Sequence, residues 1–69
     1  MAKRDQYLVV MLNKEGHMIR ESPKWRHSYN AGRWVRSQPE WYASKTRNHD
    51  TADIWTSDDY TYRLVTLYA

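Results

Sequence analysis

The sequence predicts an α+β fold: a small antiparallel sheet of three to four strands, built from an N-terminal and a C-terminal hairpin, with one or two short helices in the middle. Three observations predict it. An apolar run near the start leads into a turn sequence, the end of the chain alternates with a period of two, and the middle carries residues typical of helix ends. The alternative is an all-β small sheet or barrel. We expect residues 1–69 to form a single compact domain, because the chain is short and has no linker or internal repeat.

The N-terminal hairpin begins with residues 6–12, QYLVVML, whose Val and Leu content predicts a strand near the centre of the sheet. Asn13 and Gly16 in the following NKEG favour a turn, so residues 17–21 would return antiparallel. The apolar run is too short for a signal peptide, and no segment approaches the roughly 20 apolar residues of a membrane span. We therefore expect a cytoplasmic protein that does not enter a membrane.

The C-terminal hairpin rests on residues 59–68, DYTYRLVTLY, where every second side chain would share one face. The residues of that face are Tyr60, Tyr62, Leu64, Thr66 and Tyr68. Residues 52–55, ADIW, would pair with this strand through a turn containing Asp58 and Asp59. The first and last strands are the expected centre of the sheet.

The segment 23–31 is consistent with either a helix or a strand. Ser22, Pro23 and Gly32 fit an N-cap, a first-turn proline and a C-terminal glycine. KWRHSY and RWVRS could instead be strands around Asn30-Ala31-Gly32. The sequence leaves both open.

A second helix is expected within residues 37–47, SQPEWYASKTR. Ser37 and Glu40 have the spacing of a capping box, and Pro39 is tolerated in a first helical turn. Lys45 and Arg47 would then lie near its C-terminal end, where cations interact favourably with the helix dipole.

The composition limits both the core and the chemistry. A chain of 69 residues buries only about 60% of the surface that its unfolded form exposes. There is no Phe, so four Trp and six Tyr must supply much of the apolar area. There is no Cys, which excludes disulfides, thiolate-bound zinc and a thiol nucleophile.

Charge is unevenly distributed along the chain. Residues 1–21 carry four basic and three acidic side chains, residues 22–48 carry six basic and one acidic, and residues 49–69 carry one basic and four acidic. The middle also contains three of the four Trp residues. This combination of cations and aromatic rings is typical of surfaces that bind an anionic partner.

From this pattern we predict a non-enzymatic binding protein that docks on an acidic protein surface and inhibits or adapts that partner. Trp and Arg are enriched among the residues that dominate binding energy at protein interfaces. The predicted partner-binding residues are Lys24, Trp25, Arg26, Arg33, Trp34, Arg36, Trp41, Lys45 and Arg47.

Three alternatives remain open. The same residues could bind single-stranded or non-specific nucleic acid, with cations on phosphates and rings on bases. The chain could form a homo-oligomer through an unpaired strand edge. The rings could instead belong to the core, with the acidic C-terminal part neutralising the basic middle.

Catalysis and metal binding receive little support. His49, Asp50 and Asp53 have suitable side chains, but they lie between predicted elements where such residues are typical of turns. No glycine-rich phosphate loop, nucleophile elbow or zinc-protease motif is present. We expect no metal, no cofactor and no enzyme activity. The chain resembles, in general type only, the small accessory proteins that phages and mobile elements encode, and no motif identifies a family.

Overall fold

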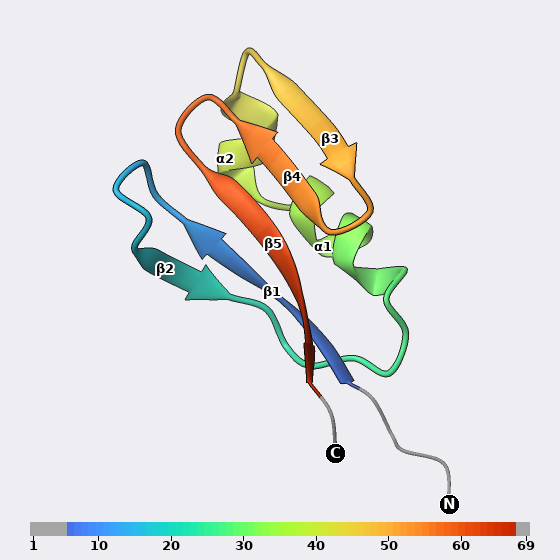
Figure 1. The fold of residues 1–69 in the computed structure, drawn as a ribbon. Coiled ribbons are helices and arrows are strands. Elements are labelled where there is room, and N and C mark those ends of the chain that lie inside the picture. Colours follow the sequence, from blue (N-terminus) through green and yellow to red (C-terminus); the bar gives the residue numbers. More distant parts are fainter. Residues whose placement is uncertain (1–5, 68–69) are drawn as a thin grey trace, which may run out of the picture.

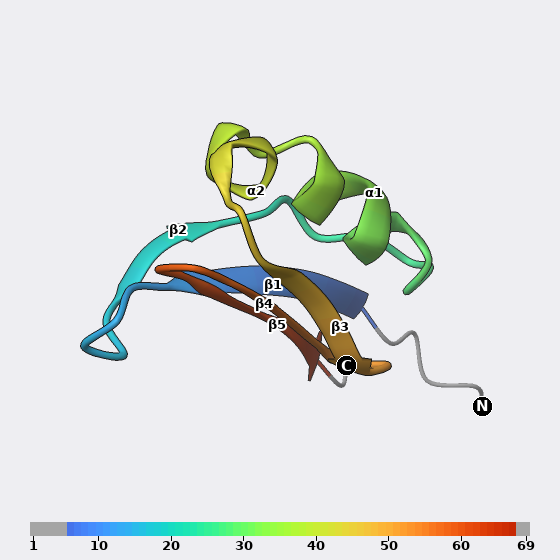
Figure 2. The same cartoon turned by 90° about the horizontal axis from the view of Figure 1, so that it is seen from above.

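A computed structural model describes residues 6–67, which form five strands and two helices (Figure 1). In chain order they are β1 (Gln6–Leu12), β2 (Met18–Glu21), α1 (Asn30–Arg36), α2 (Pro39–Ala43), β3 (Arg47–Thr51), β4 (Ile54–Ser57) and β5 (Thr61–Leu67). The strands make one antiparallel sheet in the order β2-β1-β5-β4-β3. Both helices lie on one side of this sheet (Figure 2). The α+β class is confirmed, whereas the expected three to four strands were too few, and the open sheet is not a barrel.

Both predicted hairpins form. Gly16 has a φ of 83°, and the Asn13 side-chain oxygen accepts hydrogen bonds from the backbone N–H groups of Glu15 and His17, at 3.0 and 2.9 Å. These contacts fix the β1–β2 turn. β1 pairs with β5 along its whole length, from Gln6 opposite Leu67 to Leu12 opposite Thr61. The first and last strands therefore lie side by side in the middle of the sheet, as expected.

The additional strand is β3, where a helix end and a loop were expected. Every residue of this strand is exposed, and its sequence RNHDT shows no apolar alternation. It exists because its backbone pairs with β4, from Arg47 opposite Ser57 to Thr51 opposite Ile54. An edge strand whose residues are all polar and exposed leaves little signal in a side-chain pattern.

A helix and a strand were both open for residues 23–31, and neither describes the whole segment. Residues 22–25 run beside β1, and Trp25 exchanges two backbone hydrogen bonds of 2.8 Å with Tyr7. The helix α1 begins only at Asn30 and contains Gly32 in its interior. Its register follows from Ala31 and Val35, which are four residues apart and both buried against the sheet.

The second helix is shorter than expected. Ser37 does not cap α2; it lies at the end of α1, where its hydroxyl donates a 2.6 Å hydrogen bond to the Trp34 carbonyl. The N-cap residue of α2 is Gln38. Lys45 and Arg47 lie beyond the end of α2, so they are not positioned at its C-terminal turn. Within residues 6–67 neither helix has the length and apolar character needed to cross a membrane.

The core lies between the helices and one face of the sheet. Its buried members are Val9, Met11, Ala31, Val35, Trp55 and Tyr62, and Trp25, Trp34, Trp41, Tyr60 and Leu64 pack against them while half-buried. The predicted alternation of the last strand is confirmed at Tyr62 and Leu64, and Tyr68 lies outside the described residues. The helices therefore cover only this face of the sheet.

Asp58 joins the β4–β5 turn to the connection between α2 and β3. Its carboxylate accepts the backbone N–H groups of Lys45 and Thr46, at 2.8 and 2.9 Å, and its own N–H donates to the Ser44 hydroxyl at 2.9 Å. The bonds from Lys45 and Thr46 lower the pKa of Asp58 from its ordinary value of 3.8. Asp58 and Asp59 lie in the turn, as expected, and Asp58 also anchors the start of β3.

This arrangement predicts a pH-dependent stability. A lowered folded-state pKa contributes stability that is complete above the ordinary pKa and is lost as the pH falls through the folded-state value. Asp58→Asn should therefore lower the free energy of unfolding near pH 7, and the difference from wild type should be smaller near pH 3, below the ordinary pKa, where the unfolded chain is mostly protonated and the charged folded form loses part of its advantage. Urea unfolding at both pH values measures this, and an equal difference at both would contradict it.

Candidate binding face on α1

The cations of the middle segment are exposed and lack ion pairs in the described part of the chain. Lys24, Arg26, Arg33, Arg36, Lys45 and Arg47 are all exposed. Within residues 6–67 the ion pairs are Lys14 with Asp59 at 3.1 Å and Arg20 with Glu40 at 2.9 Å. Direct pairing with the acidic C-terminal residues therefore does not neutralise these six cations.

Glu40, on α2, is the one acidic side chain of residues 22–48, and it is neutralised by Arg20 from strand β2. Arg20 on β2 donates from Nη1 to Oε1 and from Nη2 to Oε2 of Glu40, each at 2.9 Å. This bidentate pair lowers the pKa of Glu40. Arg20 also donates to the Gln38 side-chain oxygen at 2.7 Å, so this contact joins α2 to the sheet.

The structure divides the nine predicted site residues into three groups. Lys24, Trp25 and Arg26 belong to the edge segment beside β1, whereas Arg33, Trp34 and Arg36 lie on α1. Trp41, Lys45 and Arg47 follow along α2 and the start of β3. The set therefore does not form a single cluster.

The tryptophans have a different role from the cations. Trp25, Trp34 and Trp41 are half-buried and pack against the core. The ring of Trp41 meets that of Tyr62 edge to face, with centroids 5.7 Å apart. Only part of each tryptophan is therefore available to a partner, because the core uses the rest.

Two exposed aromatic residues were not among the predicted site residues. Tyr29 is 66% exposed and Tyr42 is 70% exposed, the highest values among the large hydrophobic residues of the described chain. The ring of His27 stacks on that of Tyr29 with a centroid distance of 5.4 Å. For Tyr29 the sequence does contain an indication: it lies four residues before Arg33, a spacing that places two side chains on one side of a helix.

We name Tyr29, Arg33 and Arg36 the α1 cationic face. Tyr29 precedes the helix but has a helical backbone, with φ −63° and ψ −19°. Its spacing of four and seven residues from the two arginines places all three on one side of α1. The buried residues Ala31 and Val35 lie on the opposite side, so this face points away from the sheet.

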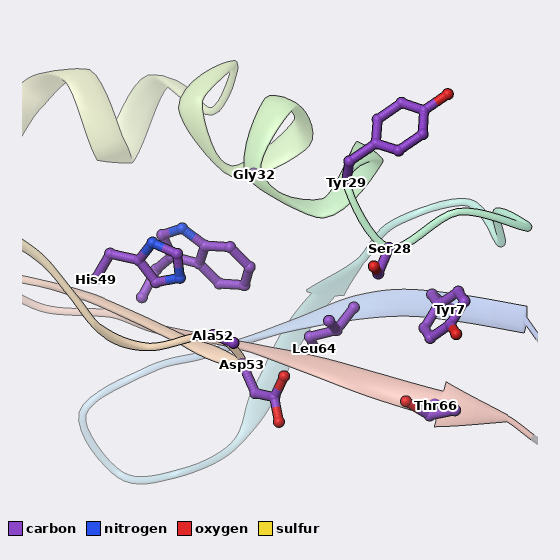
Figure 3. Close-up of a pocket in the computed structure, with 10 residues that line it drawn as sticks. Tyr7, Ser28, Tyr29, Gly32, His49, Ala52, Asp53, Leu64 and Thr66 are labelled. Carbon is purple, nitrogen blue, oxygen red and sulfur yellow. The ribbon is translucent and has the colours of Figure 1, made fainter.

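A pocket of about 390 Å³ lies between the first turn of α1 and the sheet (Figure 3). Its lining includes Tyr7, Trp55 and Leu64 from the sheet, and Ser28, Tyr29 and Gly32 from the helix side. The ring of His49 is stacked on that of Trp55 with a centroid distance of 4.5 Å. In Figure 3 the Tyr29 ring points outward at the rim. Polar side chains line the pocket as well, among them Ser28, Asp53 and Thr66.

Comparisons with protein-family models, with curated proteins and with solved structures find no match for this chain. The site must therefore be interpreted from its own geometry.

Arg36 connects the cationic face with the pocket. A Cβ atom added at Gly32 would come within 2.9 Å of Arg36 Nη1, so the guanidinium lies back along α1 against this residue of the pocket lining. The positive charge of Arg36 therefore lies near one end of the pocket, although Arg36 itself does not line it. This combination suits a ligand that presents a carboxylate next to an apolar side chain.

The residues weighed for metal binding have other contacts. His49 stacks on Trp55, and the Asp53 backbone carbonyl accepts a 2.8 Å hydrogen bond from the Leu64 N–H group. Among residues 6–67, no group of three His, Cys, Asp or Glu side chains is arranged to hold a metal ion.

Proposed function

We propose that this chain is a small non-enzymatic binding protein that places the α1 cationic face on an acidic surface of a protein partner and thereby modulates that partner. The observation that carries the proposal is the set of six exposed cations without ion pairs in the described chain, two of which lie with the exposed Tyr29 on one side of α1. Such cations accelerate encounter with an acidic surface and orient the complex.

The side chains around the pocket favour a polypeptide ligand. Tyr and Arg are enriched among the residues that dominate interface energy, and Tyr29, Arg33 and Arg36 bring both types together. The pocket beside them is large enough to receive a bulky apolar side chain of the partner. We assign Arg33 and Arg36 to carboxylates of the partner and the pocket to its apolar anchor.

The remaining predicted residues have supporting roles in this proposal. Lys24, Arg26, Lys45 and Arg47 steer the partner by long-range attraction. The half-buried Trp25, Trp34 and Trp41 hold the elements that carry the cations, and their exposed edges add contact area.

Nucleic-acid binding is the second candidate, because the same exposed cations could neutralise phosphates and the stacked pair of His27 and Tyr29 offers an aromatic surface. It is less well supported, since Trp25, Trp34 and Trp41 are partly occupied by the core and are less available for base stacking.

Two synthetic peptides test the proposal. Both are rich in glutamate; one carries a central leucine and the other an alanine at that position. The leucine peptide should bind about tenfold more tightly, because burying the larger side chain gains more free energy. Intrinsic fluorescence measures binding, since Trp55 lines the pocket.

Different results would contradict the apolar anchor in the pocket and the acidic protein partner. Equal affinity for both peptides would show that the pocket takes no apolar anchor. Absence of binding by either peptide, together with tight binding of a single-stranded oligonucleotide, would overturn the acidic protein partner in favour of nucleic acid.

A further inference from the structure

The face of the sheet opposite the helices, which we name the open face, carries apolar side chains interspersed with polar ones. Because Val9, Met11 and Tyr62 point toward the helices, their neighbours along β1 and β5 point the other way. Strand pairing groups these residues in cross-strand rows: Met18-Leu12-Thr61-Thr56-Asn48, Glu21-Val10-Arg63-Ile54-Thr51, Leu8-Val65 and Gln6-Leu67. No described helix covers them (Figure 2).

Most apolar side chains of this face are only partly buried within the described chain. Val10, Leu12, Ile54, Val65 and Leu67 are half-buried, whereas Leu8 is buried. Met18 at the edge is 56% exposed. A sheet with one face covered by helices usually places polar residues on its other face, so these aliphatic residues indicate a surface that associates.

One row of the open face carries two opposite charges. Glu21 on β2 and Arg63 on β5 are both exposed and both register with Val10, which lies between them on β1. Two strand spacings separate them by about 9–10 Å. Among the described residues no ion pair joins them.

We propose that two copies of this chain pack open face to open face, with the Glu21 carboxylate of each copy paired with the Arg63 guanidinium of the other. A two-fold axis that runs along the strands at Val10 places β1 on β1 and β2 on the other copy's β5. Each row then faces its own equivalent, Val10 meets Val10, and the two ion pairs form reciprocally.

The charges also specify this position of the axis. An axis through β5 would bring Arg63 of one copy against Arg63 of the other, and burying two like charges costs free energy. The offset by one strand replaces this repulsion with two attractive pairs. A second copy is therefore the occupant that matches both the apolar and the charged residues of the row.

This dimer leaves the helices of the two copies on its two outer sides, because each copy contributes its helix-free face. The α1 cationic face of each copy stays exposed. The dimer and the docking of an acidic partner are consequently independent and can be tested separately.

Charge reversal tests the dimer. Sedimentation velocity over a concentration series compares wild type with Glu21→Arg, with Arg63→Glu and with the double reversal. The dimer of each single variant should have a dissociation constant about 100-fold higher than that of wild type, because the substitution creates two like-charge pairs. The double reversal restores both pairs and should associate like wild type.

A mixture of the two single variants distinguishes the proposed dimer most clearly. One copy of Glu21→Arg and one of Arg63→Glu would again form two opposite-charge pairs across the two-fold axis, so an equimolar mixture should associate although each variant alone does not. Arg33→Glu makes the same charge change on the other side of the molecule and should leave the dimer unchanged. A monomeric wild type, single variants that dimerise normally, or a mixture that stays monomeric would each overturn the proposal.

Discussion

Tyr62→Ala is expected to lower the free energy of unfolding by about 3–5 kcal/mol, a large fraction of the total stability of a small domain. Tyr62 is fully buried at the centre of the sheet, between the helices and the strands, and the ring of Trp41 rests against it. Removing the ring leaves a cavity that short helices on one face cannot fill. Urea unfolding followed by circular dichroism measures the loss.

Tyr62→Phe is the matched control, because it keeps the ring and removes only the hydroxyl. That hydroxyl is buried without a hydrogen-bond partner among the described residues, and burial raises the pKa of Tyr62. The phenylalanine variant should be as stable as wild type, or more stable by about 1 kcal/mol. A loss as large as that of Tyr62→Ala would show that the hydroxyl is needed.

The double variant Arg33→Glu/Arg36→Glu is expected to weaken binding of the leucine-containing acidic peptide by about 100-fold or more. Both substitutions place a negative charge where the peptide presents its own carboxylates. Both arginines are exposed, so the free energy of unfolding should fall by about 1 kcal/mol at most, mainly through the loss of cations from the last turn of α1. Fluorescence titration measures the affinity and urea unfolding the stability.

Arg63→Glu provides the matched control for net charge. It makes the same change of charge per substitution on the open face, away from α1, and at physiological salt it should alter peptide affinity little because separated charges are screened. If Arg63→Glu lowered peptide affinity as much per substitution as Arg33→Glu/Arg36→Glu does, binding would depend on net charge and not on the α1 cationic face.

Side-chain pattern was sufficient to predict four of the five strands. β1 and β5 carry strong apolar or alternating patterns, and the turn residues between β1 and β2 include Gly16 at a positive φ. β3 could not be found in this way, because all its residues are polar and exposed, and its backbone pairing and the stacking of His49 on Trp55 depend on a partner strand. Its presence follows from tertiary structure.

Two residues that are typical of helix ends have other roles in this structure, so they did not indicate the helix positions correctly. Ser22 and Gly32 suggested a helix between them, but Ser22 instead accepts a 2.8 Å hydrogen bond from the Val9 N–H group, and Gly32 lies inside α1. The true register depends on which side chains reach the sheet. That contact is not encoded in end-cap residues.

The exposure of the cations in residues 22–48 could be expected from the sequence, since charged side chains need no tertiary partner; the positions of the aromatic rings could not. The tryptophans could not be assigned to core or surface from composition, because in this chain they pack against the core while staying half-exposed. The pairing of Glu40 with Arg20 joins residues 20 positions apart and has no local signal.

A competition experiment tests the central claim, that the α1 cationic face docks on acidic protein. Labelled leucine-containing acidic peptide is bound to the wild-type chain at about 0.15 M salt and displaced with unlabelled peptide or with a single-stranded oligonucleotide of equal charge. Displacement by the peptide at much lower concentration than by the oligonucleotide is the predicted result. Displacement by the oligonucleotide at the lower concentration would contradict it and identify nucleic acid as the partner.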